Sequence, residues 1–83
     1  MNEREKIRFA LDMLARIKAP LDEGSVCDHV EKMTGETMLP SEREAFVRNL
    51  EGRGWVERFR SAYVDGVVML ALTPRGRVAL AGI

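Results

Sequence analysis

The fold of this chain is decided by residues 41–76, SEREAFVRNLEGRGWVERFRSAYVDGVVMLALTPRG. Ser41 and Glu44 form the S-x-x-E capping box that begins many helices. Gly52 is typical of the end of a helix, because glycine adopts the backbone conformations that stop one. The segment therefore predicts a helix over 41–53, which leads directly into residues of a different pattern.

The residues after this helix predict an antiparallel hairpin over 55–72. Two runs rich in β-branched and aromatic residues flank Asp65-Gly66, a pair that favours a two-residue type I′ turn. Such a turn would place Phe59 opposite Leu72 and would fix the register of the whole hairpin.

This register divides the hairpin into two faces, because successive side chains of a strand point to opposite sides. The face expected to cover the core carries Trp55, Phe59, Tyr63, Val68, Leu70 and Leu72. The face expected to meet solvent carries Val56, Arg58, Arg60, Ala62, Val64, Val67, Met69 and Ala71. The second face is apolar toward the tip of the hairpin, and an apolar stripe in water often marks a protein contact.

Two helices are expected before residue 41. Apolar residues recur at helical spacing after Asn2, a candidate N-cap, and predict a helix over 3–18. A second helix is expected over 25–34 with Ser25 as its cap, although Asp22 could start it a turn earlier. The connector between these two helices could hold a short strand.

One more helix is expected after the hairpin, over 74–81, with Thr73 as its cap and Pro74 at its first position. Three helices, a two-stranded antiparallel hairpin and a short C-terminal helix, in this order, predict an α+β fold of the winged-helix type. With 83 residues the chain is expected to form a single domain over 1–83.

The helix over 41–53 is expected to bury one side and expose the other. Phe46, Leu50 and Ala45 are assigned to the inward side. The outward side is expected to carry Arg43, Glu44, Val47, Arg48 and Glu51. An ordinary solvated helix face explains this mixture of arginine and glutamate as well as a binding surface does.

The charge of the chain is balanced overall but unevenly spread. It has 13 Lys and Arg and 13 Asp and Glu residues, and residues 21–44 hold seven acidic side chains and only two basic ones. Because lysine and arginine supply most of the affinity for phosphates, this distribution argues against nucleic-acid binding.

No other class of function has a clear motif. The longest apolar run, 67–72, is far shorter than the roughly 20 residues of a membrane span, and the charged start resembles no signal peptide, so a cytoplasmic protein is expected. A single cysteine, Cys27, with His29 nearby gives neither a disulfide nor a zinc site, so no metal or cofactor is expected. No nucleophile or phosphate-binding loop indicates an enzyme.

Residues 50–58, LEGRGWVER, and 70–77, LALTPRGR, resemble bacterial winged-helix regulators of the MarR and PadR type. The resemblance implies that the helix over 41–53 enters the major groove of DNA. It implies base-facing positions at Ser41, Arg43, Glu44, Val47 and Arg48, and positions near phosphates at Arg58 and Arg60.

Two functions follow as hypotheses. The first is a small DNA-binding protein, a transcriptional regulator of bacterial or phage type that acts as a dimer. The alternative is a protein-interaction module or homodimer that does not bind DNA and uses the apolar wing residues Val64, Val67 and Met69. Neither function involves a membrane or a metal.

Overall fold

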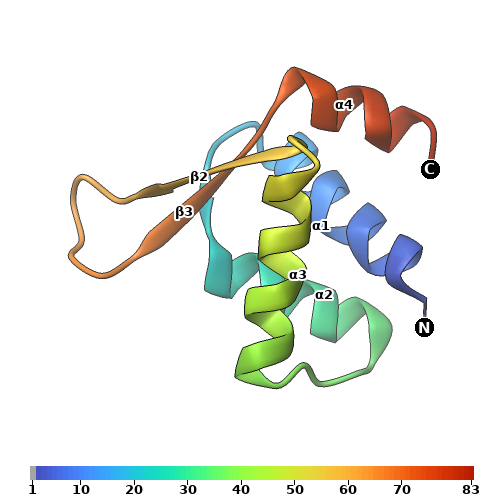
Figure 1. The fold of residues 1–83 in the computed structure, drawn as a ribbon, viewed down its shortest axis with the longest axis horizontal. Coiled ribbons are helices and arrows are strands. Elements are labelled where there is room, and N and C mark those ends of the chain that lie inside the picture. The colour runs from blue at the N-terminus through green and yellow to red at the C-terminus, as the bar shows by residue number, and fades with distance from the viewer. Residues whose placement is uncertain (1) are drawn as a thin grey trace.

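The computed structural model describes residues 2–83 and has an α+β fold. Its elements in chain order are α1 (Glu3–Ile17), β1 (Leu21–Asp22), α2 (Glu23–Thr34), α3 (Pro40–Gly52), β2 (Val56–Arg60), β3 (Val68–Leu72) and α4 (Pro74–Ala81). The strands form one antiparallel sheet in the order β1-β3-β2, and the β2-β3 hairpin projects from the helices as a wing (Figure 1). This arrangement confirms the predicted winged helix, with β1 as a third strand.

Side chains of the expected kind cap three of the helices. Asn2 Oδ1 accepts a hydrogen bond from the Glu5 N–H at 2.9 Å at the start of α1. Asp22 caps α2 by accepting from the Ser25 N–H at 2.9 Å, so α2 begins a turn earlier than a Ser25 cap would allow. Thr73 Oγ1 accepts from the Gly76 N–H at 2.9 Å at the start of α4.

The start of α3 differs from the prediction. The N-cap is Leu39, and Glu42 Oε1 accepts a hydrogen bond from the Leu39 N–H at 2.8 Å. Pro40 takes the first helical position, which suits its fixed φ and its missing N–H. The predicted capping box of Ser41 and Glu44 is therefore wrong. The Glu44 carboxylate has no capping role and can bind elsewhere.

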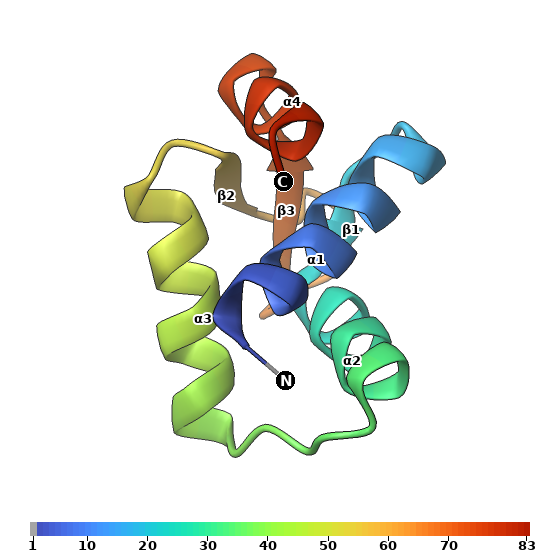
Figure 2. The ribbon, with the colours of Figure 1, turned by 90° about the vertical axis from the view of Figure 1, so that its right-hand side faces the viewer.

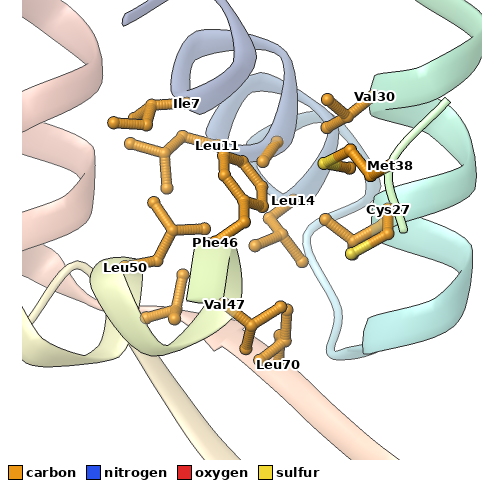
Figure 3. Packing of buried hydrophobic residues seen from close by; sticks show 13 residues of the cluster. Ile7, Leu11, Leu14, Cys27, Val30, Met38, Phe46, Val47, Leu50 and Leu70 are labelled. Atoms are coloured by element: carbon orange, nitrogen blue, oxygen red, sulfur yellow. The ribbon is translucent and has the colours of Figure 1, made fainter. Parts of the chain in front are cut away.

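The core lies between the three long helices and the sheet (Figure 2). Side chains from α1, α2, α3 and β3 meet there (Figure 3). The residues of this cluster are Ile7, Ala10, Leu11, Leu14, Val26, Cys27, Val30, Met38, Phe46, Val47, Leu50, Val56 and Leu70.

Two assignments on α3 are reversed. Val47 was expected to face outward but is only 1% exposed, whereas Ala45, assigned to the inside, is exposed. Val47 follows Phe46 and precedes Leu50 by three positions, so all three lie on one side of the helix. Valine also gains more free energy from burial than alanine because it removes more apolar surface from water.

The wing is paired in a different register from the predicted one. Phe59 lies opposite Met69 rather than Leu72, and the Ser61 N–H donates to the Val67 carbonyl at 2.8 Å. A type I′ turn needs a positive φ at both central residues. Among the described residues of the tip only Gly66 has one, at 77°, so the turn is not of this type.

The side chain of Ser61 explains the wider tip. Its Oγ accepts hydrogen bonds from the N–H groups of Tyr63 and Val64, each at 3.1 Å. These bonds satisfy backbone donors that a continued hairpin ladder would otherwise use. The strands therefore separate after Ser61.

The three-residue change in register exchanges the two faces of β2. Val56 and Arg58 lie on the same face as Leu70, and Val56 is buried. Phe59, assigned to the core, lies on the outer face and is 39% exposed, and Tyr63, also assigned to the core, is 96% exposed. The core assignment of Leu70 on β3 is correct, since this residue is fully buried.

Candidate nucleic-acid interface

The solvent-facing side of α3 differs in composition from the predicted one. Ser41, Ala45 and Arg48 recur at helical spacing and are all exposed. Glu44 lies beside them, with its side chain 42% exposed. Val47, predicted to face outward, cannot face a ligand because it is buried in the core. Ala45, predicted to face inward, is exposed instead.

Arg58, on β2, joins the wing to both α2 and α3. Its guanidinium donates to Glu44 through Nη1 at 3.2 Å and through Nη2 at 2.9 Å, and its Nε donates to Glu23 at 3.2 Å. The Arg58 side chain is 21% exposed, so it lies partly within the protein. We call this set of three residues the wing clamp.

The wing clamp shifts the pKa values of Glu44 and Arg58. Hydrogen bonds from Arg58, and then from Arg48, lower the pKa of Glu44. The hydrogen bond to Glu44 raises the pKa of Arg58. Both groups therefore keep their charges at neutral pH, and the positive charge of Arg58 is matched by carboxylates of the protein itself.

Arg43 is turned toward α2 instead of the exposed side of α3. It contacts Asp28 at 2.6 Å and Glu31 at 2.9 Å. Glu31 Oε2 also accepts a hydrogen bond from the Met38 N–H at 3.0 Å, and this bond is the main cause of the lowered pKa of Glu31. These two α2 carboxylates, which help to make the middle of the chain acidic, are thus bound by an arginine from α3.

The remaining basic candidates are more accessible. The Arg48 side chain is 73% exposed and contacts Glu44 at 3.1 Å, one helical turn away. Arg60 is exposed at the end of β2 and has no carboxylate partner within residues 2–83. Of the predicted phosphate contacts, Arg60 is available and Arg58 is held in the wing clamp.

The apolar wing residues do not form one continuous stripe. Val64 is 57% exposed in the tip, but Val67 and Met69 are half-buried. Met69 lies opposite Phe59 on the outer face of the hairpin. Val67 instead lines a groove between the wing, α2 and α3.

The role of Glu23 was not evident from the sequence. It lies 35 residues before Arg58 in the chain, and no sequence pattern links the two residues. Buried Cys27 also lines the groove beside Glu23, and burial raises the pKa of its thiol to about 11.

Among residues 2–83 no group of three or more His, Cys, Asp or Glu side chains is arranged to hold a metal ion. None of the described helices is long and apolar enough to cross a membrane.

The sequence matches no protein-family profile and no curated protein. Its fold matches solved structures of archaeal transcriptional regulators. RosR of H. salinarum aligns with 99% of this chain and 67% of its own, at 20% identity and a TM-score of 0.73.

Two further regulators match over 89% of this chain. TA0346 of Thermoplasma acidophilum does so over 74% of its own length, at 21% identity and a TM-score of 0.66. BldR of Sulfolobus solfataricus does so over 50% of its own length, at 25% identity and a TM-score of 0.60. These likenesses, with the arrangement of helices and sheet, identify the chain as a winged-helix domain.

Proposed function

We propose that this chain is a transcriptional regulator that binds duplex DNA with α3 in the major groove. The observation that carries the proposal is the uncovered side of α3, on a fold shared with transcriptional regulators. The resemblance of residues 50–58 and 70–77 to the MarR and PadR type supports the same function. No residue is assigned a catalytic role.

The exposed side of α3 carries groups that suit base edges. Arg48 can donate two hydrogen bonds to guanine O6 and N7, Ser41 can donate or accept, and the methyl group of Ala45 suits the thymine methyl. Glu44 accepts three hydrogen bonds from Arg48 and Arg58, and a carboxylate has about four acceptor positions. One position is left, which suits the amino group of cytosine.

Arg58 and Arg43 are assigned a positioning role within this proposal. Arg58 holds the wing root against α3, and Arg43 holds the start of α3 against α2. Arg60, beyond the wing clamp, is the wing residue assigned to a phosphate. A net charge of zero is compatible with this function, because several of the carboxylates are paired with arginines of the protein itself and do not stand as unpaired negative charges.

The test is selection from a random duplex library, followed by fluorescence anisotropy with the selected duplex. Arg48→Ala is expected to weaken binding to that duplex by about 1–3 kcal/mol, roughly 5- to 150-fold, and to relax the preference at one base pair. Arg16→Ala is the matched control, since Arg16 is also an exposed helical arginine paired with a carboxylate one turn away. Equal affinities of both variants and the wild type would refute base contact by Arg48.

A second interaction surface is favoured by the tip of the wing. Tyr63 and Val64 are exposed there, and Phe59 is partly exposed on the adjoining outer face. We propose a second copy of this chain as the partner at this tip, because one module of this size buries little DNA surface and a dimer would double it. Val64→Glu is then expected to convert a dimer to a monomer in sedimentation experiments, while Val78→Glu, a similarly exposed change on α4, should not. A dimer that survives Val64→Glu would exclude this contact.

A further inference from the structure

Two arginines beside the end of α3 differ from the arginine of the wing clamp because no carboxylate of residues 2–83 binds them. Arg43, Arg48 and Arg58 all bind carboxylates. Arg53 and Arg75 have no carboxylate partner within residues 2–83, and both are exposed. Their positive charges are therefore available to a ligand.

Arg53 is held in place without losing its charge. Its guanidinium lies over the ring of Trp55, 4.8 Å from the centroid, and its Nε donates to Asn49 Oδ1 at 2.8 Å. A guanidinium stacked on a ring keeps donors at its edge, and these can bind phosphate oxygens. Ordering the side chain in advance lowers the entropy cost of binding.

Arg75 is brought to the same place by the joint between α3 and α4. Thr73 Oγ1 donates to the Gly54 carbonyl at 2.6 Å, and the Thr73 N–H donates to the Trp55 carbonyl at 3.1 Å. Gly54 has a φ of 74° and no side chain, and atoms of Arg75 lie 3.3 Å from the position that a Cβ of Gly54 would occupy. Arg75 therefore lies over Gly54, next in the chain to Arg53.

Arg53 lies on the side of α3 away from the wing clamp. Glu44, which contacts the wing, and Asn49, which contacts Arg53, are separated by about 140° around the helix axis at about 100° per residue. Arg48 and Ala45 lie between them on the exposed side. Figure 2 shows α4 beside the turn that connects α3 to β2.

We propose that Arg53 and Arg75 form a phosphate-binding site for the DNA backbone on the flank of α3 opposite the wing clamp. This inference rests on the proposed function. A helix in the major groove lies between two sugar-phosphate strands, so each flank meets phosphates. Arg60 on the wing and the Arg53–Arg75 pair would then hold the two strands, and the exposed side of α3 would read the bases between them.

The test is the salt dependence of affinity for the selected duplex, measured by fluorescence anisotropy. The slope of log K against log salt is negative, and removing one phosphate-binding charge reduces its magnitude by about 0.9. Arg53→Gln and Arg75→Gln are therefore each expected to reduce the magnitude of this slope by about 0.9, and the double variant by about 1.8. Arg53→Lys keeps the charge and should keep most of the slope.

Arg16→Gln is the control, because it removes the same charge from an exposed position on α1. Circular dichroism at the assay temperature confirms that each variant is folded. The inference is overturned if the wild type binds with a steep slope that the double variant shares with Arg16→Gln. If the wild type does not bind duplex DNA at low salt, the proposed function itself fails, and the phosphate site fails with it.

Discussion

The arginines on the two flanks of α3 differ in what holds them. On the wing side, Arg58 is held by Glu23 and Glu44. On the other side, Arg53 is held by an aromatic ring and an amide. The first arrangement uses the charge to fix the fold, and the second fixes the side chain while the charge stays available. A count of arginines in the sequence therefore does not give the charge that a ligand meets.

The largest expected effect comes from the joint that brings Arg75 to Arg53. A Cβ added at Gly76 would collide with the Trp55 carbonyl and would lie 2.7 Å from Leu72 Cδ1. Gly76→Ala is expected to lower the free energy of unfolding by about 3 kcal/mol, because overpacking forces the backbone to shift. Urea denaturation measures this loss, and the shift of α4 should also weaken DNA binding.

Gly52→Ala is the control for this change. Gly52 is the last residue of α3, and a Cβ there meets no atom within 4 Å. Alanine is expected to stabilise the protein by up to about 1 kcal/mol, since it favours helix and restricts the unfolded chain. Equal stability of the two variants would show that the close packing at Gly76 does not hold α4.

Removal of Arg58 should cost stability without removing a phosphate contact. Arg58→Met leaves Glu23 and Glu44 without their shared partner and is expected to lower the free energy of unfolding by about 1–2 kcal/mol, allowing for partial exposure. Arg48→Met, at an exposed pair, should cost less than about 0.5 kcal/mol. If Arg58→Met instead leaves stability unchanged and reduces the magnitude of the salt slope of DNA binding by about 0.9, Arg58 belongs with the available charges.

Acid should weaken the wing clamp in a defined direction. The pKa of Glu44 in the folded protein is lowered from its ordinary value of 4.5 by the hydrogen bonds from Arg58 and Arg48. Its contribution to stability is therefore complete above pH 4.5 and is lost as the pH falls through the lowered value. Urea midpoints between about pH 7 and about pH 3 should fall less steeply for Glu44→Gln than for the wild type. Parallel curves would contradict the assigned role of this carboxylate.

The effect on stability expected for Arg53 is smaller than that for Arg58. Arg53→Ala removes the contact with the Trp55 ring and should cost about 0.5–1 kcal/mol. Arg60→Ala, at an exposed position, should change stability by no more than about 0.5 kcal/mol. If Arg53→Ala lowered the free energy of unfolding as much as Arg58→Met, the two arginines would not differ in how far they stabilise the fold.

Local signals in the sequence were enough to predict the order of the elements. The caps at Asn2 and Thr73 act within one helical turn, and the apolar spacing of α1 follows from the helix period. The start of α3 was harder to predict, because two glutamates each lie three residues after a candidate cap. Glu42 follows Leu39 and Glu44 follows Ser41, and the local sequence pattern did not show which pair begins the helix. Glu42 took the role because Pro40 fixed the first turn.

The register of the wing and the composition of the candidate interface could not be predicted in the same way. The register depends on Ser61 binding two backbone N–H groups, a choice that competes with the ladder and has no periodic signature. Arg58 meets Glu23 across 35 residues of chain, so only the folded arrangement reveals that its charge is matched. Val47 is buried and Ala45 is exposed because of the side of α3 that packs against the other helices, which the sequence of α3 alone does not specify.

The contact between Arg53 and Trp55 provides a built-in optical signal. Trp55 is the only tryptophan of the chain, and its indole lies under the guanidinium that we assign to DNA phosphate. A phosphate bound at the edge of this guanidinium would change the surroundings of the ring and hence its fluorescence. DNA binding at this flank of α3 can then be followed by tryptophan fluorescence, without a label on the protein or the DNA.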